Sequence, residues 1–262
     1  MKRVNMHAFW RAADGVIDQS DVLLEVVDAR MPYLTRNRNV ENRITRNGKS
    51  FILVLNKADL ITKKMRDDLL ERAMSKKMVF VSCKKRTGIA DLKKMIFAIA
   101  GKRRRVGKIN VGVVGYPNTG KSSVINALAG RSVAKTSPVA GVTRGVQWIS
   151  GGDDLLFLDT PGVIPPDGKD EAERAMMSVI DPEKLEAPDL AAMKIIQLFL
   201  DNDRRGLERF YGVAAGTGDA MDILLEIGRK KNFLSKGGEI DKVRTSLRII
   251  RDWQRGNLLL KL

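Results

Sequence analysis

The stretch from Gly115 to Ser122 constrains the fold of this chain more than any other. It reads Gly-Tyr-Pro-Asn-Thr-Gly-Lys-Ser, a complete G-x-x-x-x-G-K-S pattern. The apolar run Ile109 to Val114 precedes it, and apolar residues at helical spacing follow it from Val124 to Leu128. The sequence therefore predicts a strand, a phosphate-binding loop and a helix in succession. A glycine-rich turn with a chance lysine is the alternative.

The chemistry of this loop follows from its residue types. Its glycines let backbone N–H groups turn inward onto a phosphate chain, and the N-terminus of the following helix adds partial positive charge. We expect Lys121 to reach the β- and γ-phosphate oxygens as a catalytic cation, and the Ser122 hydroxyl to bind Mg²⁺. The other predicted nucleotide contacts in the loop are Asn118, Thr119, Gly120 and Ser123.

The composition limits the remaining possibilities. A length of 262 residues suits one large α/β domain with a smaller appendage. The 47 basic against 31 acidic residues, a net charge of +16, favour a polyanionic partner, most commonly nucleic acid, over a merely basic solvated surface. A single cysteine and a single histidine exclude an internal disulfide and a Cys/His zinc site. We find no signal peptide or membrane-length apolar run, and therefore expect a cytoplasmic protein without a membrane partner.

The first hundred residues alternate between strand and helix patterns. Short apolar runs predict buried parallel strands at residues 21–28, 50–55 and 78–81. Helical patterns lie at residues 9–18, 37–46, 63–75 and 88–100. This alternation is typical of an α/β fold with a mostly parallel sheet.

The second strand leads directly into Asn56-Lys57-Ala58-Asp59. An open parallel sheet presents its ligand-binding residues at the carboxyl ends of its strands. Guanine carries an N1–H and an N2 amine on one edge, and a fixed carboxylate such as Asp59 can accept from both. We expect Lys57 to lay its stem along the base and Asn56 to tie this loop to the phosphate loop. A polar site of this kind rejects the wrong base by about 10⁴, which disfavours a generic ATPase.

The region after the phosphate-loop helix supplies candidate switch residues. Within the long polar loop from Lys135 to Arg144, Thr143 is the candidate second Mg²⁺ ligand and sensor of the γ-phosphate. Two strands, near 146–150 and 155–158, are expected to form a hairpin that ends at Asp159-Thr160-Pro161-Gly162. Asp159 would hold Mg²⁺ through water, and the Gly162 N–H would contact the γ-phosphate.

Together these motifs resemble those of the translation-factor-like GTPases, in a rotated order in which the guanine motif precedes the phosphate loop. The chain is most similar to the circularly permuted YlqF/RbgA group of ribosome-assembly GTPases, whose first strand ends in D-A-R-x-P, here Asp28 to Pro32. The resemblance implies a permuted P-loop GTPase domain that uses GTP, GDP and Mg²⁺. It also implies a role in large-subunit assembly, with ribosomal RNA and a large-subunit precursor as partners.

The resemblance assigns further residues. Ser82, Cys83 and Lys84 take the place of the loop whose N–H groups contact guanine O6, with Cys83 where alanine is usual; a nucleophilic Cys83 is the alternative. Bacterial members carry a W-F-P-G-H-M stretch with a histidine proposed to assist hydrolysis. Here His7 stands among different neighbours, and a solvated histidine is the alternative.

The resemblance also bears on the rate of hydrolysis. The residue after Gly162 is Val163, where Ras-like enzymes keep a water-orienting glutamine. Other GTPases that lack this glutamine and carry asparagine in the phosphate loop, as at Asn118, often use K⁺. We therefore expect slow intrinsic hydrolysis and stimulation by K⁺, by ribosomal particles, or by both.

From about Asp170 the strand patterns give way to helices, so we expect a GTPase domain at residues 1–168 and a small all-helical domain at 169–262. In the last helix we expect an apolar stripe to pack inward and an arginine stripe to face outward as the RNA-binding surface. The apolar stripe is Ile240, Val243, Leu247 and Ile250, and the arginine stripe is Arg244, Arg248, Arg251 and Arg255. The alternatives are a solvated helix face, and a GTP-dependent switch that binds another RNA or a protein.

Overall fold

The structure is a computed structural model. It describes residues 6–72, 77–101, 107–130, 147–152, 154–159, 169–214, 216 and 218–260, without the side chains of residues 6–9, 12, 147 and 159. The first part of the chain forms α1 (Met6–Gln19), β1 (Val22–Asp28), α2 (Pro32–Thr35), α3 (Arg38–Arg46), β2 (Phe51–Asn56), η1 (Ala58–Leu60), α4 (Lys63–Glu71), β3 (Met78–Phe80), α5 (Ile89–Ala100), β4 (Ile109–Val114), α6 (Lys121–Ala129), β5 (Gln147–Ser150) and β6 (Leu155–Asp159). The second part forms α7 (Glu171–Met176), η2 (Pro182–Lys184), α8 (Pro188–Asn202), α9 (Arg204–Tyr211), α10 (Ala220–Lys230) and α11 (Lys242–Gln254).

The six described strands form one sheet in the order β3-β2-β1-β4-β6-β5. Every pair is parallel except β5 and β6, which form the predicted antiparallel hairpin at one edge. The predicted α/β fold with a mostly parallel sheet is thus confirmed. β1 lies between β2 and β4, so its carboxyl end stands between the strand of the guanine motif and the strand of the phosphate loop.

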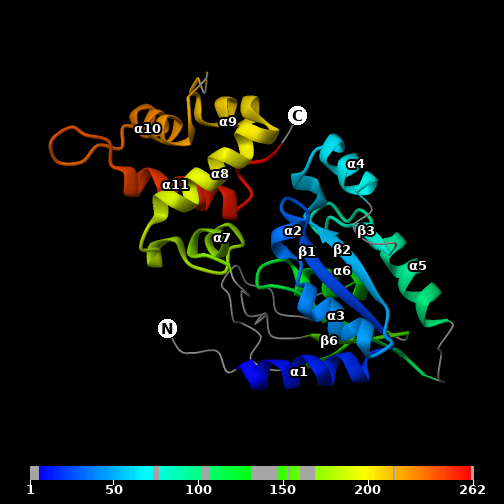
Figure 1. Ribbon diagram of the computed structural model, residues 1–262. Helices are drawn as coiled ribbons and strands as arrows, with labels where there is room; N and C mark the ends of the chain where they lie inside the picture. The colour runs from blue at the N-terminus through cyan, green and yellow to red at the C-terminus, as the bar shows by residue number, and fades with distance from the viewer. Residues whose placement is uncertain are drawn as a thin grey trace. The chain divides into compact units, whose positions relative to one another are not determined.

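Helices cover both faces of this sheet (Figure 1). On one face α5 and α6 contact each other and pack over a cluster of β-branched and leucine side chains from the central strands. On the other, α1 contacts β4 and α3. The close approach of α1 depends on Gly112, because a Cβ there would lie 2.3 Å from Ser20 Oγ. Local signals set the helix starts: the Asn37 side chain accepts from the N–H groups of Asn39 and Val40 and so caps α3.

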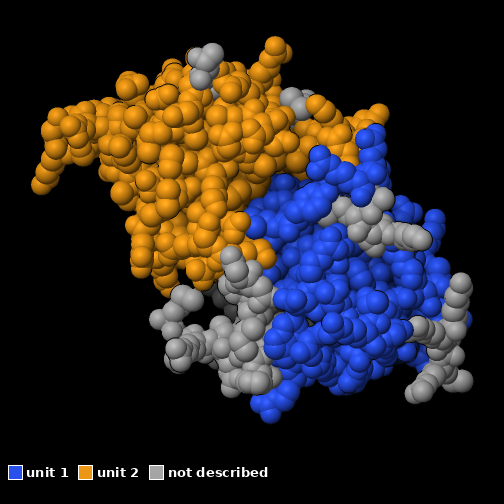
Figure 2. All heavy atoms as spheres, viewed as in Figure 1, with its two compact units in different colours: residues 1–59, 69–166 blue, residues 60–68, 167–262 orange. Residues whose placement is uncertain are grey.

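The chain divides into two compact units, shown in different colours in Figure 2. The first comprises residues 1–59 and 69–166 and holds the sheet. The second comprises residues 60–68 and 167–262 and is helical. In the second unit Trp253 is fully buried, meets Phe199 edge-on with ring centroids 6.1 Å apart, and donates from Nε1 to the Met176 carbonyl at 3.0 Å. None of the helices in the described ranges is long and apolar enough to span a membrane.

The prediction of which side chains of the last helix are buried is wrong in part. Val243 is 56% exposed, Ile240 and Leu247 are half-buried, and of the predicted stripe only Ile250 is fully buried. The buried residues of α11 are Thr245, Ser246, Ile249, Ile250, Asp252 and Trp253.

The reason is the close approach of α10 to α11. A Cβ at Gly228 of α10 would lie 2.7 Å from Thr245 Oγ1, so small polar residues occupy this contact. Farther along, Asp252 is buried because Arg248 Nε donates to it at 2.7 Å and Tyr211 Oη at 3.3 Å. The helix α9, which carries Tyr211, was also not predicted from the sequence.

Candidate nucleotide-binding site

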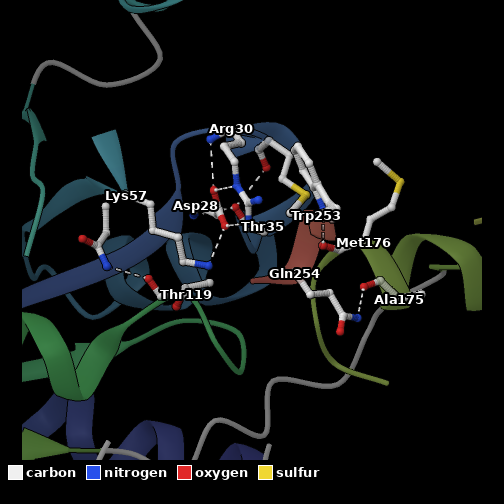
Figure 3. Close-up of polar contacts among 11 residues, drawn as sticks. Asp28, Arg30, Thr35, Lys57, Thr119, Ala175, Met176, Trp253 and Gln254 are labelled. Carbon is white, nitrogen blue, oxygen red and sulfur yellow. Dashed lines mark hydrogen bonds and ion pairs between the residues drawn. The ribbon is translucent and has the colours of Figure 1, made fainter. Parts of the chain in front are cut away.

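Three loops meet where β1, β2 and β4 end. The Gly115–Ser122 loop follows β4, the Asn56–Asp59 motif follows β2, and the Asp28–Pro32 turn follows β1. Because these strands are parallel neighbours, their carboxyl ends lie at the same edge of the sheet. The close-up in Figure 3 shows Asp28, Arg30 and Lys57 gathered there, with Thr119 beside them.

The phosphate loop is shaped by two glycines in left-handed conformation. Gly115 has φ 147° and Gly120 has φ 96°. A Cβ at Gly115 would lie 2.4 Å from the Val26 carbonyl oxygen, and one at Gly120 would lie 2.2 Å from Asn56 Nδ2. Lys121 is buried, and its Nζ donates to the carbonyl oxygens of Gly115 and Tyr116 at 2.9 and 3.0 Å. The loop thus closes around the lysine ammonium.

The guanine motif and the phosphate loop are joined directly. Asn56 Nδ2 donates to the Thr119 carbonyl at 2.8 Å, which is the predicted tie between the two loops. Asn56 is buried, and its Oδ1 has no hydrogen-bond partner among the described residues. An unpaired buried acceptor costs about 1–3 kcal/mol, so this atom is a place where a ligand donor would be favoured.

Asp59 is held from the neighbouring loop. The fully buried Ser82 donates from Oγ to Asp59 Oδ1 at 2.6 Å and accepts from the Lys85 N–H at 3.0 Å. Backbone bonds in both directions between Ser82 and Thr87 close this loop into a tight turn. Ser82 therefore orients the Asp59 carboxylate, which is the group predicted to recognise the base.

The structure argues against a nucleophilic Cys83. Burial, together with the nearby Asp59 carboxylate, raises the pKa of the Cys83 thiol to about 12. A thiol with such a pKa carries almost no thiolate at neutral pH, and the thiolate is the reactive form. Lys84, next in the chain, is exposed.

Asp28 is a residue whose role sequence reasoning missed. Its buried carboxylate accepts from Arg30 Nε at 3.0 Å, from Arg30 Nη2 at 2.8 Å and from Lys57 Nζ at 2.7 Å. Burial raises the pKa of Asp28, but Arg30 and Lys57 outweigh it and hold the pKa well below its usual range. Burial lowers the pKa of Lys57, and Asp28 opposes this shift. The available signal was that one strand ends in Asp28 and that Lys57 directly follows the end of its parallel neighbour.

A second buried polar group contacts the phosphate loop and was also missed. Tyr116 lies at a variable position of the loop, is 1% exposed, and its Oη accepts from Asn37 Nδ2 at 3.3 Å. The Asn37 N–H donates to Glu25 Oε1 at 2.8 Å. Glu25 is fully buried on β1; burial, and then the nearby Glu41 carboxylate, raise its pKa well above the usual value. A glutamate within an apolar strand was the signal in the sequence.

The remaining predicted site residues are placed as follows. Ser122 and Ser123 lie half-buried in the first turn of α6, and Asn118 has a left-handed φ of 60°. Asp159 ends β6, paired in register with Val113 of β4, and its side chain is outside the described part. Thr143, Gly162 and Val163 lie outside the described residues, and so does the side chain of His7 in α1.

The four arginines of α11 are partly engaged within the protein. Arg244, Arg248 and Arg255 are exposed and Arg251 is half-buried. Arg244 stacks over the Phe233 ring at 4.5 Å, Arg248 pairs with Asp252, and Arg251 pairs with Glu183. The predicted outward stripe is therefore present, but three of its members have intramolecular partners.

Comparison with known proteins shows what this chain is similar to. The family model described as 50S ribosome-binding GTPase matches residues 110–209, which begin at the phosphate-loop strand. An uncharacterised GTP-binding protein of Methanocaldococcus jannaschii is 42% identical over 252 residues, which are 95% of this chain and 65% of that protein. The chain is similar to these GTP-binding proteins, and its guanine motif precedes its phosphate loop. Nucleolar GTP-binding protein 2 of Pneumocystis carinii, another relative, is 32% identical over 95% of this chain and 52% of its own length.

Two solved structures have a fold similar to that of this chain. GDP-bound YlqF of T. maritima has a TM-score of 0.63 and 23% identity, over 94% of this chain and 95% of that one. The GNP-bound form has a TM-score of 0.58, also with 23% identity, over 95% and 94%. The chain spans about half to two thirds of the length of the curated relatives named above.

Proposed function

We propose that this protein is a circularly permuted GTPase that binds and hydrolyses GTP and acts as a nucleotide-dependent switch on precursors of the large ribosomal subunit. The observation that carries the proposal is the bond from Asn56 to the Thr119 carbonyl, which fixes the guanine motif against the phosphate loop. A base and a phosphate chain of one nucleotide need this juxtaposition. The M. jannaschii relative, described as GTP-binding, supports the same nucleotide.

Base recognition is assigned to Asp59, whose carboxylate accepts a hydrogen bond from Ser82. With Ser82 donating to one carboxylate oxygen, Asp59 is oriented to accept from the N1–H and N2 amine of guanine. Asn56, Lys57, Cys83 and Lys84 complete the base side of the site. Cys83 is half-buried and Lys84 is exposed at the turn that follows β3.

Phosphate binding uses Lys121 together with the loop N–H groups. Lys121 Nζ now contacts two loop carbonyl oxygens, and phosphate oxygens would replace these as its partners. Ser122, in the first turn of α6, and Asp159, the last residue of β6, have side chains with the oxygen atoms that Mg²⁺ prefers. Thr143 and the Gly162 N–H complete the proposed set. Bound Mg²⁺ supplies charge compensation for the phosphates.

Activation by K⁺ is part of the proposal. No glutamine follows Gly162, so a further cation beside the phosphates would assist hydrolysis where Ras-like enzymes use a side chain. Asn118 is the candidate residue for this cation, and its left-handed backbone lies at the tip of the loop. Ribosomal particles are the second proposed activator.

Turnover of GTP by purified protein tests this site. Lys121→Ala and Ser122→Ala should each abolish turnover, because one removes charge compensation and the other a metal ligand. Wild-type hydrolysis should be faster in KCl than in NaCl at equal ionic strength, and Asn118→Ala should remove the difference. Lys94→Ala, which changes an exposed lysine of α5, is the matched control. Full turnover in both loop variants would place the active site elsewhere.

The ribosomal part of the proposal rests on the matched family, described as ribosome-binding, and on the net charge of +16. Residues 1–168 would form the GTPase domain and 169–262 the helical domain that binds ribosomal RNA, in the cytoplasm. Arg244, Arg248, Arg251 and Arg255 would contact phosphates. The exposed Arg251–Glu183 pair does not oppose this, because such a pair contributes only about 0–1 kcal/mol and exchanges readily. The pair of Arg248 with Asp252 is of another kind, because Asp252 is buried.

A further inference from the structure

The Asp28–Pro32 turn has no role in the scheme above, although it lies between the two nucleotide-binding loops. It follows β1, whose neighbours in the sheet are β2 and β4. Thr35 fixes the turn, since its Oγ1 accepts from the Asp28 N–H and donates to the Met31 carbonyl, both at 3.0 Å. The side chain at the centre of this arrangement is Asp28, in Figure 3 the acceptor of the dashed bonds from Arg30 and Lys57.

The Asp28 carboxylate holds two cations from different elements. Arg30 donates to both of its oxygens and is itself fully buried, so the Asp28–Arg30 pair is rigid. Lys57 shares Oδ2 of the same carboxylate, with side-chain exposures of 25% for Lys57 and 3% for Asp28. A buried carboxylate left with one cation fewer would be costly, which makes this contact hard to give up.

The backbone of Lys57 brings the two side chains together. Asp28 is paired in register with Asn56, so Lys57 is the first residue beyond that pair. Lys57 has a φ of 61°, a left-handed conformation that is unfavourable for a non-glycine residue. Such a conformation persists where surrounding contacts determine it, and the ion pair with Asp28 is the contact that the Lys57 side chain makes here.

We propose that Asp28 is a positioning residue for nucleotide binding: fixed by Arg30, it holds the Lys57 ammonium so that the lysine stem is ordered before a base arrives. This inference rests on the proposed function, which assigns that stem to the face of the purine. Ordering in advance removes the cost of immobilising a long side chain on binding. Asp28 contributes to affinity for any purine, whereas Asp59, oriented by Ser82, selects the base.

The test is a double-mutant cycle with a fluorescent GDP derivative as the probe. Asp28→Asn keeps the shape of the side chain and removes its charge, while Lys57→Met keeps most of the stem and removes the ammonium. Each should weaken binding about tenfold, the equivalent of ordering one long side chain. The double variant should bind no more weakly than Lys57→Met, because Asp28 acts through Lys57.

Base selection is the second readout. Asp28→Asn should keep the wild-type ratio of guanine to xanthine nucleotide affinity. Asp14→Asn is the matched control, since Asp14 pairs with Arg43 at 2.7 Å in the same unit away from the strand ends, and it should leave affinity unchanged.

Additive losses in the cycle would show that Asp28 acts independently of Lys57 and would overturn the inference. Wild-type affinity in Lys57→Met would overturn it whether or not Asp28→Asn folds. Failure of the wild type to bind any guanine nucleotide would instead overturn the proposed function, so the two failures are distinguishable.

Discussion

Two single side chains carry predictions, Asp59 for recognition of the base and Glu25 for the dependence of stability on pH. Asp59 has one oxygen occupied by the Ser82 hydroxyl, which fixes the direction in which the other faces. Glu25 lies fully buried on the central strand, and Asn37 connects it to Tyr116 of the phosphate loop. Each residue supports a separate prediction.

Asp59→Asn should shift preference from guanine to xanthine nucleotides. The amide presents a donor where the carboxylate presented an acceptor, and xanthine carries an oxygen at C2 where guanine carries an amine. The Ser82 hydroxyl can still donate to the amide oxygen, so the loop should keep its shape. Competition of GTP against XTP for a bound fluorescent nucleotide measures the shift. If the Asp59→Asn variant kept the full preference for guanine nucleotides, Asp59 would not be the residue that recognises the base.

Glu25→Gln should stabilise the protein at neutral pH. The raised pKa means that the folded state keeps a proton that the unfolded state releases above pH about 4.3. The unfolded state therefore binds fewer protons, and the free energy of unfolding falls as pH rises from that value to the folded pKa. Glutamine cannot ionise, and its oxygen can still accept from the Asn37 N–H.

Urea unfolding at pH 5 and pH 7 checks this prediction. The stability advantage of Glu25→Gln over wild type should grow with pH by up to about 1.4 kcal/mol per unit. Glu71→Gln, at an exposed position, is the matched control. Parallel pH profiles for wild type and Glu25→Gln would contradict a protonated Glu25.

At the scale of helices and strands, sequence patterns predicted the sheet well and the helical unit less well. The strands β1, β2 and β4 are continuous apolar runs because both faces of the sheet are covered, and such runs are easy to find. The motifs Gly115–Ser122 and Asn56–Asp59 were found because their chemistry depends on fixed local spacing. The contact of Lys57 with Asp28 depends on strand pairing, which local spacing does not encode.

The inward face of α11 could not be read from apolar residues alone. Thr245 and Asp252 are buried because of partners on other helices, Gly228 in the first case and Tyr211 in the second. Val243 belongs to the apolar pattern and is exposed. Helix α9 was missed because its sequence, Arg-Arg-Gly-Leu-Glu-Arg-Phe-Tyr, has few apolar residues.

Paired truncations on α11 measure which face is buried. Ile249→Ala removes a fully buried side chain and should lower the free energy of unfolding by about 2–5 kcal/mol. Val243→Ala changes a side chain that is 56% exposed and should stay within about 0.5 kcal/mol. Urea denaturation of both variants gives the comparison. Equal losses in the free energy of unfolding would support the buried face predicted from the apolar pattern, which includes Val243.

For the whole molecule, the order of the motifs along the chain determines what the proposed switch residues are attached to. Gly162 is the proposed γ-phosphate sensor, and only seven residues separate it from Asp170, the N-cap of α7. Release of Gly162 and Thr143 on hydrolysis would therefore act directly on the chain that enters the helical unit. If RNA binding by that unit favours one nucleotide state, RNA must alter nucleotide affinity by the same factor.

The affinity of the protein for large-subunit particles, measured with a non-hydrolysable GTP analogue and with GDP at one fixed salt concentration, tests this central claim most directly. The two affinities should differ about 5- to 150-fold, the usual range of allosteric coupling. A variant with Arg244, Arg248, Arg251 and Arg255 all changed to alanine should bind weakly in both states while hydrolysing GTP normally in isolation. Equal wild-type affinities in the two nucleotide states would contradict the proposed switch. Unchanged binding by the variant would show that these arginines form a solvated helix face and do not contact RNA.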